Sequence, residues 1–329
     1  MRCLQTSDQW RGVSEKQATP LFMEGKRMEK KRKKSWKKGY GWGYLMISPL
    51  VLGLGVFYFY PVFKVFFDSF HEVGAFNQTK WIGLANYEKM FQDPVMWQAL
   101  GNTVKYVLII VPSTIILALI LATFLNMGIK GRSFFRVVYF IPAITMGAAV
   151  AMIWRWMYNG DYGIINFILN KLGMESVQFL SNPSTALVSI SIVSIWSTVG
   201  YNMIILLAGI QGISKSYYEA AAIDGASSIQ QFGKITLPLV FKATMPNLVT
   251  SMAANFNGFG LIYFLTQGGP INTEMQFAGD TDILISWIYK LTLNQQMYDI
   301  AAVMSVLLFI FVGVVSLWNF RRTTSFKEL

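Results

Sequence analysis

The sequence predicts an all-α membrane protein with six transmembrane helices, and three observations support this prediction. Only 14% of the 329 residues are charged, whereas soluble domains have about 25%. Hydrophobic residues make up 53% of the chain. Six apolar runs are each close to the ~20 residues that a helix needs to cross a bilayer. These runs are Tyr44–Phe63, Val104–Leu125, Val137–Trp156, Ala186–Ile210, Ala243–Leu265 and Ile300–Trp318.

Residues 1–42 precede the first apolar run and are polar, basic and without periodicity, so we expect a mostly disordered tail. Twelve of the 28 basic residues lie before Tyr44. A basic run beside a span is a topology signal and a contact for anionic lipid headgroups, so the net charge of +11 does not require nucleic acid. No secretory signal is expected. One hypothesis is that the chain starts at Met23 or Met28.

The distribution of Lys and Arg between the loops predicts the orientation. If the N-terminus is cytoplasmic, the segments after the second, fourth and sixth spans hold nine basic residues, against seven on the other side. The basic N-terminal tail adds to this excess. Because basic residues accumulate on the cytoplasmic side, we expect both termini to be cytoplasmic. The six-helix domain is expected at 43–320, followed by a short cytoplasmic tail at 321–329.

The half-polar segment Tyr217–Val240 separates the fourth and fifth spans, on the predicted cytoplasmic side. Tyr217–Ile223 consists mainly of helix formers. Asp224-Gly225 is a turn signal, and Ser227-Ser228 offers an N-cap for a second helix. That helix is expected to stop near Pro238. The segment is therefore predicted to form a helix, a turn and a second short helix.

Four residues of this helix pair can form one apolar face: Ile223, Ile229, Phe232 and Ile235. A compact amphipathic unit of this kind suits docking into a groove on a soluble partner. It also suits a helix pair that lies flat on the lipid surface. The residues alone leave both interpretations open.

Several functional classes lack their sequence signatures. The chain has no GxxxxGK[ST] phosphate loop, no HExxH and no GxSxG elbow, so we expect neither ATP binding nor an enzyme. Its single cysteine, Cys3, excludes an internal disulfide, and no metal site is expected. The second to sixth spans contain essentially no acidic residue, which argues against an ion-coupled carrier. A passage lined by neutral polar and aromatic groups would suit a sugar.

Polar and aromatic residues gather in the fourth and fifth spans. The candidate substrate contacts are Tyr201 in the fourth span and Ser251, Asn255 and Asn257 in the fifth. Ser251 and Asn255 are four residues apart, so one helical face carries both. The same residues could instead form hydrogen bonds between neighbouring helices. Their number favours a lined cavity.

Glu-Ala-Ala at 219–221, Gly225, Ile235 and Leu237-Pro238 resemble the EAA motif of ABC-importer permeases. In that family this segment, here 215–240, is the coupling helix that seats in a cleft of the ATP-hydrolysing subunit. The resemblance implies a type I ABC-importer permease (MetI-like) fold. It also implies contacts with the ATPase from Glu219, Ala220, Ala221, Asp224 and Gly225.

Phe134–Leu169 and Asn255–Glu274 are similar to the carbohydrate branch of these permeases, and Ala278–Leu293 resembles the maltose- and maltodextrin-type members. In such permeases, positions matching Tyr201, Ser251 and Asn255 contact the sugar. Two positions depart from that pattern, because Ala254 replaces an aromatic contact and Gly258 replaces an asparagine. Both changes would enlarge the site and remove a stacking face.

The resemblance therefore implies a permease subunit of an ATP-driven importer in the bacterial cytoplasmic (inner) membrane. Its substrate would be an oligosaccharide, maltodextrin-like or another, acidic ones included. The implied partners are a second, homologous permease, two ATP-binding subunits, an extracytoplasmic oligosaccharide-binding protein and membrane lipid. ATP and Mg²⁺ would bind the ATPase subunits, so no cofactor is expected for this chain. The alternative is a stand-alone secondary sugar carrier.

Overall fold

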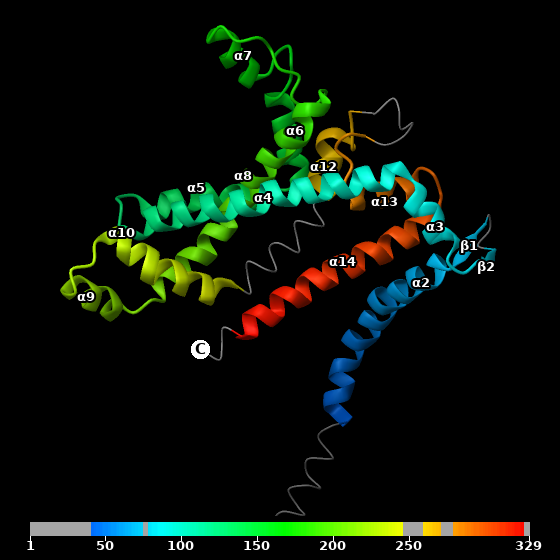
Figure 1. The fold of residues 1–329 in the computed structure, drawn as a ribbon, viewed down its shortest axis with the longest axis horizontal. Coiled ribbons are helices and arrows are strands. Elements are labelled where there is room, and N and C mark those ends of the chain that lie inside the picture. Colours follow the sequence, from blue (N-terminus) through cyan, green and yellow to red (C-terminus); the bar gives the residue numbers. More distant parts are fainter. Residues whose placement is uncertain (1–40, 75–77, 246–258, 271–278, 326–329) are drawn as a thin grey trace, which may run out of the picture. The chain divides into compact units, whose positions relative to one another are not determined.

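The computed structural model describes residues 41–74, 78–245, 259–270 and 279–325 (Figure 1). The chain divides into two compact units, Met1–Lys64 and Val65–Leu329. In the first unit, every described residue is helical, and one π-helical turn, η1 (Gly55–Phe59), interrupts the α-helix. The predicted tail at 1–42 lies almost wholly outside the described residues, and the predicted domain boundaries stay predictions.

The helix of the first unit continues as α2 (Tyr60–Ser69) into the second unit, where a small hairpin follows. Strands β1 (His71–Val73) and β2 (Thr79–Trp81) pair antiparallel, with His71 opposite Trp81. The sequence predicted an all-α chain, and this hairpin departs from it because the loop after the first span is long enough to fold back on itself. Helices nevertheless dominate the described residues.

The remaining elements of the second unit are helical. They are α3 (Ala85–Gln92), α4 (Pro94–Asn126), α5 (Arg132–Ile144), α6 (Gly147–Met157), α7 (Ile164–Lys171), α8 (Pro183–Gln211), α9 (Lys215–Ile223), α10 (Ser228–Gln231), the π-helical turn η3 (Phe232–Thr236), α12 (Phe259–Thr266), α13 (Leu284–Leu293) and α14 (Tyr298–Ser325).

Four helices in the described part of the chain are long and apolar enough to cross a membrane. They are Gly41–Ser69, Pro94–Asn126, Pro183–Gln211 and Tyr298–Leu317, and they contain the first, second, fourth and sixth predicted spans. The predicted fifth span lies largely at 246–258, outside the described residues. The total of six spans therefore stays a prediction.

The predicted third span is two helices, α5 and α6, which meet at an angle of 99°. The break follows from the local sequence. Pro142 lies inside the last turn of α5 and removes a backbone donor there. The backbone of Thr145 is extended, with ψ of 139°, and its hydroxyl donates a hydrogen bond to the carbonyl of Ile141 at 2.8 Å. This bond satisfies a carbonyl that the helix leaves open at its end.

Both π-helical turns precede a proline. η1 ends two residues before Pro61, and η3 ends two residues before Pro238. The wider turn relieves the crowding that a proline ring creates against the preceding turn of an α-helix. The helix after η3 therefore continues through 237–245. The expectation that it stops near Pro238 is wrong for this reason.

Helices α4, α5 and α8 form the centre of the second unit, with α4 and α5 both packed on α8. Small side chains allow the close approach that membrane helices need. A side chain on Gly200 would overlap the backbone carbonyl of Tyr139 in α5. The hydroxyls of Tyr106 in α4 and Ser194 in α8 share a hydrogen bond of 2.7 Å. Polar contacts thus join helices that are apolar elsewhere.

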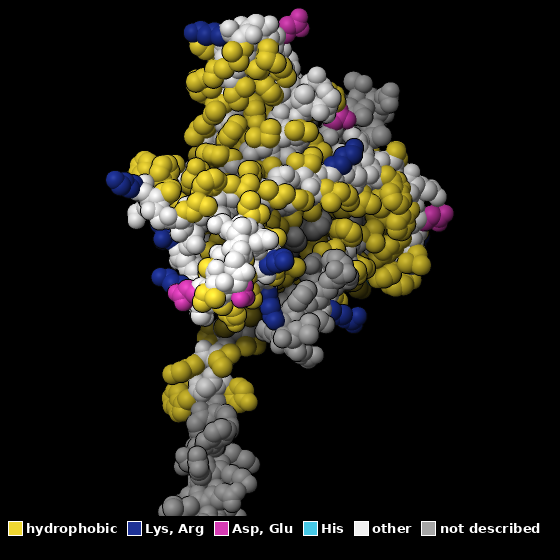
Figure 2. Space-filling model, turned by 60° about the vertical axis from the view of Figure 1, so that its left-hand side comes forward, with side chains coloured by type: hydrophobic (Ala, Val, Ile, Leu, Met, Phe, Trp, Pro, Cys, Tyr) yellow, Lys and Arg dark blue, Asp and Glu magenta, His cyan; other side chains and the backbone are white. Residues whose placement is uncertain are grey.

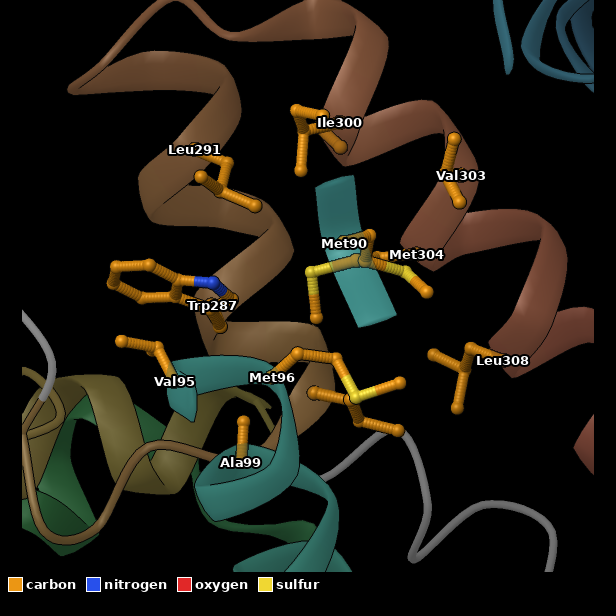
Figure 3. Close-up of a cluster of buried hydrophobic side chains, with 12 residues drawn as sticks. Met90, Val95, Met96, Ala99, Trp287, Leu291, Ile300, Val303, Met304 and Leu308 are labelled. Carbon is orange, nitrogen blue, oxygen red and sulfur yellow. The ribbon is translucent and has the colours of Figure 1, made fainter. Parts of the chain in front are cut away.

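A second packing centre joins α3, α4, α13 and α14. Figure 3 shows Met90 and Met96 between the side chains of α13 and α14. Trp287 is 4% exposed and lies beside Val95. Methionine suits this position because its flexible side chain fills irregular gaps. The cluster anchors α13, which carries part of the polar cluster described next.

Candidate functional site

The first helix of the predicted cytoplasmic segment, α9, ends in a Schellman motif. Ala226 N–H donates to the carbonyl of Ala221 at 2.9 Å, and Gly225 N–H donates to that of Ala222 at 3.1 Å. Gly225 has φ of +77°, a conformation that favours glycine. The predicted turn at Asp224-Gly225 is confirmed. Because a Cβ on Gly225 would meet no atom within 4 Å, the constraint here is the backbone angle.

The second helix, α10, begins with the expected N-cap, Ser227. Its hydroxyl accepts from Gln230 N–H at 3.4 Å, and the Gln230 side chain accepts from Ser227 N–H at 2.9 Å, which completes a capping box. Tyr218 and Thr236 share a hydroxyl hydrogen bond of 2.8 Å, which joins α9 to η3. The segment is therefore a folded unit held by its own contacts.

This unit exposes two of the four apolar residues that were predicted to form its docking face, whereas Phe232 and Ile235 are half-buried. Ile223 and Ile229 are 87% and 84% exposed. Glu219 and Asp224 are also exposed, and no described residue bonds to either carboxylate. Hydrophobic side chains cover most of the described surface in view in Figure 2, with charged ones few and scattered. The five predicted coupling residues lie together at the end of α9: Glu219, Ala220, Ala221, Asp224 and Gly225.

Only one predicted substrate contact lies within the described residues. Tyr201 is in α8 and is 52% exposed. Ser251, Asn255 and Asn257 lie outside the described residues, as do the two departing positions, Ala254 and Gly258. The sugar pocket therefore stays a prediction.

A buried polar cluster, which the sequence did not predict, surrounds Asp282 at the start of α13. Lys290 Nζ lies 2.6 Å from Asp282 Oδ2, Gly279 N–H donates to the same oxygen at 2.8 Å, and Ser286 donates to Oδ1 at 2.9 Å. Side-chain exposure is 2% for Asp282 and 15% for Lys290. Burial raises the pKa of Asp282, and the neighbouring ammonium and hydrogen-bond donors oppose this rise.

Two glycines let the backbone of residues 266–270 approach this cluster. Gly268 has φ of +85°, and a Cβ there would overlap the Asp282 carboxylate and the Lys290 ammonium. A Cβ on Gly279 would overlap the carbonyl of Gly268. The cluster thus holds a turn that lies more than ten residues away in sequence.

The same cluster is bonded to α4. Asn102 donates to the carbonyls of Asp280 and Asp282, each at 3.0 Å. Leu284 N–H donates to the Thr103 hydroxyl at 2.9 Å. The adjacent polar pair at 102–103, in a largely apolar helix, is the sequence signal that could have indicated this site.

A family model described as "Binding-protein-dependent transport system inner membrane component" matches residues 103–325. MalF of Thermococcus litoralis, a trehalose/maltose transport system permease protein, is 35% identical over 82% of this chain and 89% of its own length. GanP of Bacillus subtilis, a galactooligosaccharides transport system permease protein, is 31% identical over 93% of this chain and 78% of its own length.

A solved structure has a similar fold. A chain of a bacterial ABC transporter involved in the import of the acidic polysaccharide alginate superposes with a TM-score of 0.73. The alignment covers 91% of this chain and 99% of that chain, at 24% sequence identity. A related structure of a bacterial alginate ABC transporter holds a periplasmic protein with a bound alginate pentasaccharide.

Proposed function

Because the chain belongs to the family of binding-protein-dependent transport system inner membrane components, we propose that it passes an oligosaccharide across the bacterial inner membrane by alternating access. The chain is a sugar ABC importer permease and an integral inner membrane protein. Its family is a class of transport permeases, not of enzymes. GanP and MalF are named for neutral sugars, and a similar fold belongs to an importer of an acidic polysaccharide. The proposed substrate is therefore an oligosaccharide, either neutral or acidic.

The segment at 215–240 is the observation that carries the proposed mechanism. It is compact, it exposes two isoleucines almost fully, and it holds two carboxylates that no described residue bonds. Exposed apolar side chains beside unpaired charges fit a protein groove better than a lipid surface, where the charges would meet anionic headgroups. We assign this segment to coupling with an ATPase on the cytoplasmic side.

In the proposed cycle, two ATPase subunits bind ATP and Mg²⁺ and close on each other. The coupling segment carries this motion into α8, which ends at Gln211, four residues before α9 begins at Lys215. The passage between this chain and a second, homologous permease then opens outward to receive sugar from the extracytoplasmic binding protein. Hydrolysis of ATP resets the passage inward. Both termini of this chain remain in the cytoplasm.

The sugar is proposed to contact Tyr201 together with Ser251, Asn255 and Asn257. Tyr201 is half-exposed on a helix that is long and apolar enough to cross a membrane, which supports a ring that faces a passage or a neighbouring subunit. Aromatic faces and amide groups are the contacts that a neutral sugar uses. This assignment rests on the sequence resemblance and on the exposure of one ring.

Gly225→Asp tests the coupling segment. The substitution puts a side chain at φ of +77° and adds a charge beside Asp224. We expect loss of ATPase assembly or of sugar-stimulated ATP hydrolysis in the importer reconstituted with its partners, while sugar binding by the external protein is unchanged. Gly233→Ala is the control, because a Cβ there meets no atom within 4 Å. Normal sugar-stimulated hydrolysis in Gly225→Asp would refute the assignment.

Tyr201→Ala combined with Asn255→Ala tests the pocket. We expect uptake to be lost and basal ATP hydrolysis to be retained, because neither side chain belongs to the coupling segment. Tyr201→Phe keeps the ring and is expected to retain most uptake. Unchanged uptake in the double variant would remove the pocket assignment.

A further inference from the structure

A polar cleft of about 420 Å³ lies between the end of α6, the loop before α8 and the turn at 266–270. Its lining includes Arg155, Gln178, Ser181 and Thr266. Arg155 and Gln178 are exposed. None of these residues belongs to the coupling segment or to the predicted sugar contacts.

One wall of the cleft is a folded loop, held by Asn166. This side chain is 1% exposed and donates to the carbonyls of Asn159 and Val177, each at 3.0 Å. It also accepts from Val177 N–H at 2.8 Å. The two ends of the loop are thereby bonded to one buried amide. Because this loop is already ordered, binding of a partner does not require further loss of its conformational entropy.

The opposite wall is held by the Asp282 cluster. Thr281 donates to the carbonyl of Gly269 at 2.5 Å, and Asp280 N–H donates to the carbonyl of Pro270 at 2.8 Å. Gly269 and Pro270 line the cleft. Both walls are therefore fixed by hydrogen bonds, and the Thr266 hydroxyl takes part in them because it bonds to the Ile262 carbonyl at 3.2 Å and to the Thr281 hydroxyl at 2.9 Å.

Arg155 has no hydrogen bond or ion pair with any residue that the structure describes. A guanidinium beside amide and hydroxyl groups is a strong site for a carboxylate, because it can donate two parallel hydrogen bonds. The cleft thus carries a positive charge that no described carboxylate neutralises. The group that complements it is an aspartate, a glutamate or another carboxylate.

The position of the cleft along α8 indicates where its ligand comes from. Ser181 lines the cleft two residues before α8 begins, and the coupling segment follows the other end of α8. A helix of 29 residues is about 43 Å long, which is enough to cross a bilayer. If the coupling segment faces the cytoplasm, the cleft faces the outside.

The loop beside the cleft also carries exposed apolar side chains. Phe167 in α7 is 57% exposed, and Leu172, the residue after α7, is 72% exposed. Arginine and aromatic residues are enriched at protein interfaces, so the cleft and the exposed apolar side chains of this loop both suit a protein partner. This combination favours a protein carboxylate over that of a free sugar.

We propose that the Arg155 cleft receives an acidic side chain of the extracytoplasmic binding protein when that protein docks on the importer. This inference rests on the proposed function, because it needs the coupling segment to be cytoplasmic. The contact anchors the docked protein on this permease subunit and leaves the sugar contacts in the spans free.

The test is Arg155→Glu in the complete importer, reconstituted in nanodiscs with its ATPase and second permease. Sugar-loaded binding protein is titrated, and sugar-stimulated ATP hydrolysis reports the apparent Kd. We expect the apparent Kd to rise by about tenfold or more, with basal hydrolysis and the rate at saturation unchanged. Arg155→Lys is expected to show a smaller rise, because it keeps the charge but not the paired donors.

Lys80→Glu is the matched control, since it makes the same charge change in β2, on the same predicted side. An apparent Kd within twofold of wild type for Arg155→Glu would overturn the proposal, and so would an equal rise for Lys80→Glu. An effect that occurs only in nanodiscs of anionic lipid would assign the cleft to a headgroup instead. If the wild-type importer shows no stimulation by binding protein, the proposed function itself fails.

Discussion

Lys290→Met is expected to destabilise the fold by leaving a buried carboxylate without its cation. In the native structure Lys290 Nζ lies 2.6 Å from Asp282 Oδ2, and the two side chains are 15% and 2% exposed. Methionine matches the length of the lysine stem, so the packing of the stem is largely preserved. The substitution therefore removes the charge and little else.

The size of the effect follows from the burial of the pair. Removing one partner of a buried ion pair costs about 3–5 kcal/mol, because the remaining charge keeps its desolvation penalty. The partial exposure of Lys290 places this pair at about 3 kcal/mol. For a chain of 329 residues the entropy of unfolding is about 0.7 kcal/mol/K, so the Tm is expected to fall by roughly 4–5 °C.

Thermal unfolding of the purified protein in detergent, followed across pH, measures this loss. Burial raises the pKa of Asp282, and the variant lacks the ammonium that opposes the rise. A carboxyl whose folded-state pKa lies above its unfolded-state pKa binds more protons in the folded state, so stability increases as the pH falls through the folded-state value. The Tm deficit is therefore expected to be largest near about pH 8 and smaller near about pH 5.

Lys290→Met combined with Asp282→Asn is the matched control. It removes both charges and keeps an acceptor for Gly279 N–H, so we expect it to recover more than half of the lost Tm. A Tm change below about 2 °C in the single variant would refute the reasoning. So would a double variant that is less stable than the single one.

Three other substitutions test separate contacts. Gly200→Ala would place a methyl group against the carbonyl of Tyr139, so it should destabilise the fold by about 1–3 kcal/mol and lower the Tm. Gly313→Ala is the control, because a Cβ there meets no atom within 4 Å, and it should leave the Tm unchanged. Ser227→Ala should cost about 1 kcal/mol locally, so amide exchange in α10 should accelerate; unchanged exchange would contradict the capping box. Asn166→Leu leaves buried backbone groups unpaired and should speed proteolysis of the loop at 159–182; wild-type cleavage rates would contradict its role.

The parts of the site that the sequence predicted well depend on local chemistry. The turn at Gly225 and the N-cap at Ser227 are short-range features, in which one residue type satisfies one backbone requirement. The long apolar helices are equally local, since length and composition decide them. Such features need no knowledge of distant residues.

The structure departs from the sequence prediction at prolines, where a helix can either bend or continue. Pro142 precedes a sharp break in the third predicted span, whereas Pro238 lies in a helix that continues. A proline removes one donor in both cases, and the chain either bends or widens by a π-helical turn. Packing decides between the two outcomes. In η3 the bond between Tyr218 and Thr236 holds the widened turn in place, and this contact spans 18 residues.

The Asp282 cluster is harder to predict because each of its contacts is distant in sequence. Asn102 reaches the carbonyls of Asp280 and Asp282 across about 180 residues, and Gly268 approaches from the end of another helix. In water a lone aspartate and a lysine eight residues later would gain little by pairing. Inside the fold the same pair holds the turn at 266–270, and that turn is a wall of the Arg155 cleft. Lys290→Met should therefore also weaken binding-protein docking, although Lys290 does not line the cleft.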